Sequence, residues 1–358
     1  MVQPALWKRD IRMGQERLRG IQERLQQLCS HAASCQDRYK VVVGLGEGQV
    51  YALLDKRKGQ IQRTQCRGAV PKCFGTLLKR HKMTRREIYS PDNYFVDIEE
   101  EKNKAIERVK MAYDFSQQLG LGKLYVCFSG GKDSVAVYGI CALVFGESLL
   151  KKCEFHYQHT GLDHPELVRF IRREFPFVER HLPDKTMWEM IPINGMPPTR
   201  LARYCCKELK ERGGLGRFCI TGVRWAESWR RKNSRSEFES DGLLLNVDNT
   251  EDRRILEHCI PKRKHICNPI IDWSEETVWR FISEQGLPYC SLYDKGFDRL
   301  GCIGCPMDTH REEVLNSYPK YREAYLRAFE RMLKKRKQKG LYTQWKTPEE
   351  AMEWWLKD

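Results

Sequence analysis

The chain contains 358 residues and has a formal net charge of +15; 41% of its residues are hydrophobic and 31% are charged. These values are typical of a soluble globular protein of two or three domains. No apolar run approaches the roughly 20 residues that span a bilayer, and charges interrupt residues 1–10 too early for a secretory signal. We therefore expect a cytoplasmic protein with no membrane partner.

The positive charge is concentrated in the N-terminal quarter of the chain. Residues 1–95 contain 19 lysines and arginines and 8 acidic residues, a net charge of +11, whereas the rest of the chain holds only +4. A basic segment of this kind favours contact with a polyanion, and we expect nucleic acid, DNA in preference to RNA. The alternative is a basic surface that is simply solvated.

This N-terminal segment is predicted to form a small basic α+β module over residues 1–95. Apolar residues at helical spacing predict an amphipathic helix within residues 1–30. Residues 39–54 are strand-like, a turn follows at 55–59, and residues 60–64 are predicted to return as a second strand. The run Ser90-Pro91-Asp92-Asn93 breaks the pattern and marks the expected boundary.

From residue 96 onward, strand-like and helix-like segments alternate. The predicted strands are 123–128, 153–158, 178–182 and 217–222, and the predicted helices are 99–119, 165–175, 199–212 and 277–285. Such alternation predicts an α/β fold with a parallel sheet and helices on both faces. We expect this domain to span residues 96–312 and a C-terminal helical extension to occupy residues 313–358, with helices at 318–339 and 348–356.

The first strand of this domain ends in a glycine-rich turn, Ser129-Gly130-Gly131-Lys132-Asp133-Ser134, and an apolar helix follows. Glycines let the backbone approach a phosphate closely, and the N-terminus of the helix favours negative charge. Lys132 adds a positive charge, and the two serines add hydroxyl donors. The turn therefore predicts an anion site; the alternative is a tight turn with a surface lysine.

This turn resembles the pyrophosphatase loop of the adenine-nucleotide α-hydrolase superfamily, which includes ATP-dependent sulfur-transfer enzymes and phosphoadenosine-phosphosulfate (PAPS) reductases. The resemblance covers about residues 120–310 and implies a sheet of the adenine-nucleotide α-hydrolase type. It implies that residues 129–134 bind ATP and that Lys132 and Asp133 are catalytic. Lys132 would neutralise the leaving pyrophosphate, and Asp133 would hold Mg²⁺ directly or through water.

The second strand ends in another segment that resembles the PAPS-reductase-like family. Thr160 and Gly161 precede Asp163-His164-Pro165-Glu166, which opens the next helix. The resemblance implies that Thr160 and Gly161 lie beside the nucleotide. The alternative is a helix that is well capped by Asp163 and Pro165 and makes no ligand contact.

A later strand ends in Thr221-Gly222-Val223-Arg224, which resembles the family's Gly-Val-Arg element. The resemblance implies that Gly222 borders the nucleotide and that Arg224 reaches a phosphate or sulfate, to which a guanidinium fork is well suited. The next residues, Trp225 to Lys232, contain two tryptophans and three consecutive cations. This segment suits a strand of nucleic acid, or else it is a charged loop with its tryptophans docked on the core.

The fifteen cysteines indicate a reducing compartment, in which they serve as buried apolar residues and as metal ligands rather than as disulfides. The pair Cys205-Cys206 and the later Cys302-Ile303-Gly304-Cys305 have spacings that suit zinc or an iron–sulfur cluster. A further set with irregular spacing is interpreted as structural; its members are Cys29, Cys35, Cys66 and Cys73.

The four-cysteine pattern resembles the [4Fe–4S] set of adenylyl-sulfate reductases and of DNA phosphorothioation sulfur-transfer proteins. It implies a cluster, with zinc as the alternative. Adjacent thiolates strain a mononuclear site, so one of the pair Cys205-Cys206 is a candidate spare. Cys290 and Cys267 are then the rivals for the fourth position.

Two departures from the family pattern indicate the reaction. The loop has both Lys132 and Asp133, as in members that split ATP into AMP and pyrophosphate, and no cysteine follows Cys305 to act as the nucleophile of a sulfate reductase. We therefore predict an ATP pyrophosphatase-type sulfurtransferase that adenylates a nucleic acid acceptor and takes sulfur from a cysteine-desulfurase-type donor, with partner proteins of a modification complex. The alternatives are a PAPS or adenylyl-sulfate reductase and a non-catalytic nucleotide-sensing subunit that binds nucleic acid.

Overall fold

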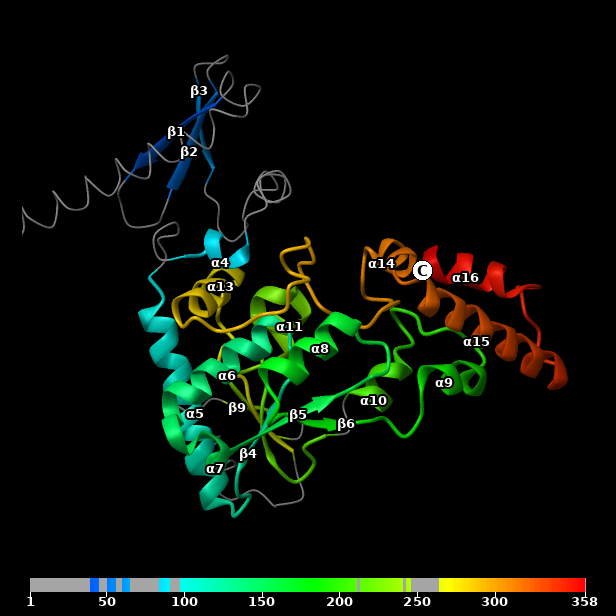
Figure 1. Ribbon diagram of the computed structural model, residues 1–358, viewed down its shortest axis with the longest axis horizontal. Helices are drawn as coiled ribbons and strands as arrows, with labels where there is room; N and C mark the ends of the chain where they lie inside the picture. The colour runs from blue at the N-terminus through cyan, green and yellow to red at the C-terminus, as the bar shows by residue number, and fades with distance from the viewer. Residues whose placement is uncertain are drawn as a thin grey trace, which may run out of the picture. The chain divides into compact units, whose positions relative to one another are not determined.

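The computed structural model describes residues 39–44, 50–55, 60–64, 84–90, 97–210, 213–240, 243–245 and 264–357 (Figure 1). The chain forms two compact units, Met1–His81 and Lys82–Asp358. The second unit begins earlier than the limit expected at residue 95, because α4 (Arg85–Ile88) is bound to it. The backbone N–H of Arg85 donates to Asp294 (2.7 Å), and the Arg85 guanidinium pairs with Asp298 (2.9 Å).

The first unit contains a three-stranded antiparallel sheet in the order β1-β2-β3. Its strands are β1 (Tyr39–Gly44), β2 (Val50–Asp55) and β3 (Gln60–Thr64). The segment 39–54, predicted as one strand, is two strands that pair with each other. The helix predicted within residues 1–30 lies outside the described residues, as do Cys29, Cys35, Cys66 and Cys73.

The second unit is built on a seven-stranded sheet in the order β6-β5-β4-β7-β10-β8-β9. The five strands from β6 to β10 are parallel, and β8 and β9 add antiparallel partners at one edge. The strands are β4 (Leu124–Cys127), β5 (Cys153–Gln158), β6 (Glu179–His181), β7 (Phe218–Ile220), β8 (Phe238–Ser240), β9 (Leu243–Leu245) and β10 (His265–Cys267). This mostly parallel sheet flanked by helices confirms the predicted α/β class.

One face of this sheet is covered by α5 (Glu99–Gln118), α6 (Lys132–Phe145) and α8 (Pro165–Glu174). On the opposite face a loop of glycines lies against Tyr125 and Cys219. A Cβ on Gly213 would come within 2.4 Å of the Tyr125 hydroxyl, and one on Gly214 would come within 2.3 Å of the Cys219 sulfur. In this region a loop, rather than the predicted helix, covers the sheet.

Helix α6 is the most apolar helix of the described chain. Together with η1 (Gly146–Ser148) and α7 (Leu149–Lys152), it forms a 21-residue stretch, Lys132–Lys152, that is long and apolar enough in composition to cross a membrane. This stretch differs from the expectation that no apolar run approaches the length of a membrane span. Val135, Val137 and Ile140 are fully buried, and α6 packs between α5 and α13 (Glu275–Glu284). The stretch is therefore the core helix of the second unit.

The C-terminal helices pack on this unit as part of one apolar cluster, although we predicted a separate extension. They are α14 (Arg311–Ser317), α15 (Pro319–Gln338) and α16 (Pro348–Lys357), and they join α9 (Met187–Asn194) and α10 (Tyr204–Leu209). Tyr325 and Trp355 lie fully buried at its centre with ring centroids 4.6 Å apart, and the Trp355 indole N–H donates to the Pro198 carbonyl (2.7 Å).

Replacement of Trp355 by alanine tests whether the C-terminal helices stabilise the whole unit. We expect Trp355→Ala to lower the free energy of unfolding by about 3–5 kcal/mol, because it removes a buried indole and its hydrogen bond. Trp229→Ala is the matched control, since Trp229 is 80% exposed and its loss is expected to change stability by less than about 0.5 kcal/mol. Urea unfolding measures both; equal effects would contradict the assignment.

Candidate functional site

The predicted loop 129–134 joins β4 to α6 at the carboxyl end of the central strands. Gly131 is the N-cap of α6, and no side chain caps this helix. Gly130 has φ +72°, and a Cβ there would come within 2.6–2.9 Å of Ile171 and Leu167 on α8. The glycine is therefore required both by the backbone conformation and by the close packing of α8. Ser134 donates to the Gly131 carbonyl (2.8 Å) and accepts from Ser129 (3.2 Å).

Two cations lie buried at the start of α6. Lys132 and Arg224 are 6% and 3% exposed, and the Asp133 carboxylate lies between them. The Arg224 Nε donates to Asp133 Oδ1 (2.7 Å), and the Lys132 Nζ lies 3.6 Å from Asp133 Oδ2 and 4.0 Å from Glu275 Oε1. The structure thus brings the three predicted catalytic residues together: two buried cations contact the carboxylate of Asp133, whose side chain is 23% exposed.

This arrangement depends on a close approach at Gly222. A Cβ at this position would lie 3.1 Å from the carbonyl carbon and oxygen of Asp133, which are backbone atoms that cannot rotate away. Gly222 therefore lets the end of β7 lie against the first turn of α6, which places Arg224 beside Asp133. Tyr293 adds a further contact, because the backbone N–H of Lys132 donates to its hydroxyl (2.9 Å).

The predicted segment Thr160-Gly161 lies at the end of β5, next to the loop of the two later cysteines. The Ile303 N–H donates to the Leu162 carbonyl (2.7 Å), and Asp163 and Cys302 form an isolated antiparallel bridge. The Cys302 sulfur lies 3.6 Å from the Thr160 hydroxyl. The Asp163 side chain accepts from the Thr160 N–H (2.8 Å) and so folds the turn on itself instead of capping α8.

The structure gathers four of the predicted metal-binding cysteines. A hydrogen bond with Cys206, together with burial and the nearby Cys302 and Cys305, raises the pKa of Cys205. For Cys290, burial raises the pKa of the thiol, and Glu166, Lys295 and Asp294 also act on it. Cys267, the other rival, lies in β10 with its sulfur 3.7 Å from the Arg108 carbonyl.

Lys210 stands beside these cysteines, although the sequence analysis assigned it no role. The proximity of Cys302 raises the pKa of Lys210 despite the opposing effect of burial, and Asp163 and Cys305 act in the same direction. Lys210 directly follows α10, the helix that carries Cys205 and Cys206. The same helix therefore brings a cation close to Cys302. An ammonium at this position favours thiolate over thiol.

The Trp-Arg segment after Arg224 forms η2 (Trp225–Glu227) and α11 (Trp229–Ser234). Trp225 is docked, since its indole N–H donates to the Arg235 carbonyl (2.9 Å), whereas Trp229 is exposed. Burial lowers the pKa of Arg231, and the neighbouring Arg299 and Arg235 add to this effect. The nearby Asp133 raises the pKa of the same guanidinium. Arg231 therefore lies close to Asp133, and cationic side chains continue from the loop 129–134 toward α11.

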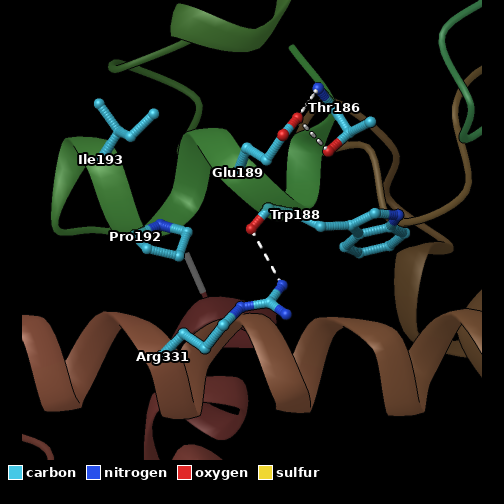
Figure 2. Close-up of a pocket in the computed structure, with 6 residues that line it drawn as sticks. All are labelled: Thr186, Trp188, Glu189, Pro192, Ile193 and Arg331. Carbon is cyan, nitrogen blue, oxygen red and sulfur yellow. Dashed lines mark hydrogen bonds between the residues drawn. The ribbon is translucent and has the colours of Figure 1, made fainter.

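A hollow of about 530 Å³ lies elsewhere, between α9 and α15 (Figure 2). Its lining includes Trp188, Ile193 and Arg331, and Arg331 donates to the Trp188 carbonyl (3.1 Å). No residue of the loop 129–134 lines it. It is therefore separate from the site formed by the loop, Arg224 and the cysteines.

Comparison with known proteins agrees with this geometry. The model of the phosphoadenosine phosphosulfate reductase domain family matches residues 123–308, which is more than half of the chain and includes the loop, Arg224 and all four gathered cysteines. Two uncharacterized proteins of Methanocaldococcus jannaschii are 28% and 26% identical over 68% and 64% of this chain. The chain spans about half the length of these relatives, 56% and 45%.

Other relatives carry the name adenosine 5'-phosphosulfate reductase. The protein of Oceanobacillus iheyensis is 24% identical over 58% of this chain and 79% of its own length, and that of Anoxybacillus flavithermus is 26% identical over 62% and 86%. Among solved structures, a phosphoadenylyl-sulfate reductase from Candida auris in complex with phosphate matches with a TM-score of 0.33 and 14% identity, covering 58% of this chain and 97% of that one.

A double-mutant cycle tests the buried charge pair. We expect Asp133→Asn to lower the free energy of unfolding by about 3 kcal/mol, because it leaves the buried Arg224 without its carboxylate, and Arg224→Met to lower it less, because Asp133 is 23% exposed and keeps Lys132. The double variant is expected to lose clearly less than the sum of the two. Urea unfolding of the four proteins measures the coupling, and strictly additive losses would show that the two groups do not interact.

Proposed function

Because the chain belongs to the phosphoadenosine phosphosulfate reductase domain family, a family of enzymes, we propose that its loop 129–134 holds the phosphates of an adenine nucleotide. The observation that carries this proposal is the pair of buried cations, Lys132 and Arg224, that share the Asp133 carboxylate, with Glu275 at the longer distance of 4.0 Å from Lys132. A buried charge without a full partner is costly, and a phosphate at the uncapped N-terminus of α6 supplies the missing negative charge.

We infer that the nucleotide is ATP and that its α–β phosphate bond is the one that breaks. Lys132 neutralises the charge that develops on the leaving pyrophosphate. Mg²⁺ accompanies ATP, and the carboxylates of Asp133 and Glu275, which both lie within 4.0 Å of Lys132, suit a cation that binds one or two carboxylates and several phosphate oxygens. Thr160 and Gly161 border the rest of the nucleotide.

The reaction that fits these groups is adenylation of an acceptor followed by entry of sulfur. An acceptor oxygen attacks the α-phosphorus of ATP, the bond to the β-phosphate oxygen breaks, and pyrophosphate leaves. A sulfur nucleophile, supplied by a cysteine-desulfurase-type donor, then displaces AMP from the acceptor. Positioning and charge neutralisation by Lys132 and Arg224 account for the catalysis of the first step.

We propose nucleic acid, and DNA in preference to RNA, as the acceptor. Arg231, Arg299 and Arg235 lie beyond the loop, where Arg231 pairs with Glu227 and Arg235 with Glu239 (3.0 Å). Trp229 presents an exposed indole on the same helix as Arg231. Phosphate contacts and base stacking need these two kinds of side chain together. The net charge of +11 in residues 1–95 acts in the same direction.

The four gathered cysteines fit a [4Fe–4S] cluster. Thiolate ligands suit both an iron–sulfur cluster and zinc, and the resemblance of the four-cysteine pattern to a [4Fe–4S] set favours the cluster. We therefore propose Cys205, Cys206, Cys302 and Cys305 as cluster ligands, with zinc as the alternative. A bound cluster would supply redox-active, thiolate-ligated iron beside the nucleotide.

Reduction of a sulfated nucleotide is the second candidate function. Relatives named adenosine 5'-phosphosulfate reductase favour it. The loop argues against it, because it contains both Lys132 and Asp133, a pair that suits the splitting of ATP into AMP and pyrophosphate. We therefore rank sulfur transfer first.

Pyrophosphate release tests the proposed reaction. We expect the anaerobically purified protein to form AMP and pyrophosphate from MgATP when duplex DNA is present, as measured by pyrophosphate exchange. Lys132→Ala is expected to lower the rate at least about 100-fold, because it removes a charge that acts on the leaving group. Lys151→Ala, which changes an exposed lysine on α7, is the control and is expected to match the wild type.

In a parallel assay, the same protein is incubated with adenylyl sulfate or PAPS and a dithiol, and the release of sulfite is measured. Sulfite release without pyrophosphate exchange would replace the proposal with the reductase function. ATP binding without either product would leave a non-catalytic nucleotide-sensing subunit.

The iron and acid-labile sulfide content of cysteine variants identifies which cysteines hold the proposed cluster. We expect Cys302→Ser and Cys205→Ser to lose most of both, because each removes a ligand. Cys290→Ser and Cys267→Ser are the controls and are expected to keep the wild-type content, since neither is among the four proposed ligands. Loss of iron in Cys290→Ser with retention in Cys205→Ser would overturn the assignment.

A further inference from the structure

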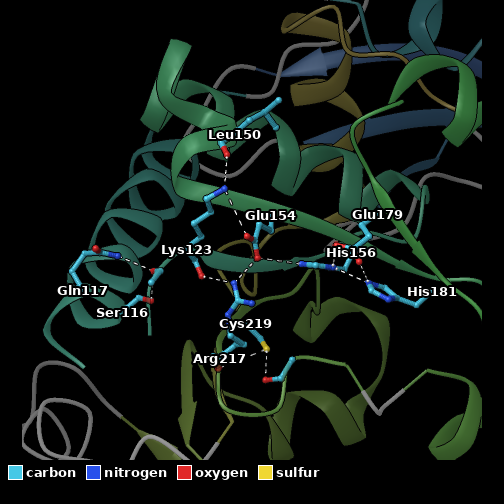
Figure 3. A network of polar contacts seen from close by, with 12 residues as sticks. Ser116, Gln117, Lys123, Leu150, Glu154, His156, Glu179, His181, Arg217 and Cys219 are labelled. Carbon is cyan, nitrogen blue, oxygen red and sulfur yellow. Dashed lines mark hydrogen bonds and ion pairs between the residues drawn. The ribbon is translucent and has the colours of Figure 1, made fainter. Parts of the chain in front are cut away.

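We propose that His156, Glu179 and His181 form a site for a divalent metal ion such as Zn²⁺, separate from the nucleotide loop and from the four cysteines. His156 lies on β5, and Glu179 and His181 lie on the neighbouring strand β6. The parallel register pairs His156 with Glu179 and Gln158 with His181, so all three side chains lie on the same face of the sheet. Figure 3 shows them converging at this edge.

The donor atoms are spaced as metal ligands are. The His156 Nδ1 and the His181 Nε2 are 2.9 Å apart and share a hydrogen bond, which a bound ion would replace; the Glu179 oxygens lie 3.5 Å from the first and 3.7 Å from the second. Tetrahedral zinc with bonds of about 2.0–2.1 Å places its donor atoms about 3.3 Å apart. Within the described part of the chain, the possible ligand atoms of His156, Glu179 and His181 all lie within 4.8 Å of one another.

Hydrogen bonding alone does not account for the carboxylate. Both distances from Glu179 to the imidazole nitrogens exceed the length of a normal hydrogen bond, so the carboxylate faces two nitrogens and bonds to neither. A cation between the three groups would satisfy all of them at once. Two imidazoles and a carboxylate are a known ligand set for zinc, in which solvent takes the fourth position.

The ring of His156 is held in place by its neighbours, as a metal ligand on a rigid strand must be. Its side chain is 6% exposed, and its ring stacks on Tyr125 with centroids 3.8 Å apart and planes 4° apart. Its second nitrogen, Nε2, is buried without a hydrogen bond and lies 3.7 Å from the Glu154 carboxylate. Arg217 donates to the same Glu154 oxygen (2.6 Å). A carboxylate behind the distal nitrogen is the usual support of a metal-binding histidine.

The other two ligands remain open to solvent, which gives an ion a route of entry. The side chains of His181 and Glu179 are 35% and 65% exposed. The His159 N–H donates to the His181 carbonyl (2.9 Å), so β6 is joined to the chain just before Thr160. A metal ion here would fix the edge strand β6 to β5.

Co²⁺ titration of the full chain tests this site. The protein is purified anaerobically, dialysed against a chelator and titrated, and bound metal is counted by absorbance and elemental analysis. We expect wild type to show d–d bands of a nitrogen and oxygen site in addition to the absorption of the metal group that the cysteines hold. His181→Ala is expected to bind one equivalent fewer, with affinity at that site lowered at least about 100-fold, since loss of even a supporting residue costs 10–100-fold.

His310→Ala is the matched control, because His310 is an exposed histidine on another element. Glu179→Gln is a second variant at an exposed position and is expected to weaken the same site while the absorption of the metal group that the cysteines hold stays unchanged. Zn²⁺ is expected to raise the midpoint of thermal unfolding of wild type and His310→Ala but not of His181→Ala. Equal Co²⁺ stoichiometry and equal spectra in wild type, His181→Ala and Glu179→Gln would overturn the proposal.

Discussion

The close approach of Gly222 to the backbone of Asp133 is the constraint on which the nucleotide site depends. A Cβ would lie 3.1 Å from the Asp133 carbonyl, closer than most such contacts, so glycine lets the segment after β7 lie directly against the first turn of α6. Arg224 thereby reaches Asp133 and stays buried beside Lys132. Two buried cations, one carboxylate and a helix N-terminus leave an excess of positive potential where water is excluded, and an anion relieves it.

The cysteine group is tied to this site by backbone rather than by side chains. The hydrogen bond from Ile303 to Leu162 and the bridge between Cys302 and Asp163 join the later cysteine loop to the turn that follows β5. The other two cysteines belong to α10, which packs in the same apolar cluster as Trp355. The C-terminal helices therefore position half of the cysteine group, which is why they are not a separate extension.

The sequence predicts the parts of this protein that are encoded locally. The loop 129–134 and strands β4 and β5 follow from a contiguous strand–turn–helix pattern. Helix α10 is shorter than predicted, because Thr199 and Ala202 exchange hydrogen bonds and close a turn before the helix begins. The three-residue strand β10 is too short to show periodicity. Contacts such as Arg231 near Asp133 join residues far apart in the chain, and no local pattern reveals them.

Strand β5 connects the three groups of functional side chains. It carries His156 in its middle, and four residues later the chain reaches Thr160, whose hydroxyl lies 3.6 Å from the Cys302 sulfur. The edge strand β6 is bound to this path twice, by its register with His156 and by the hydrogen bond between His159 and His181. A shift of β6 would therefore also move the backbone just before Thr160. An ion held between β5 and β6 would restrict that shift and so restrict the space between the loop 129–134 and the cysteines.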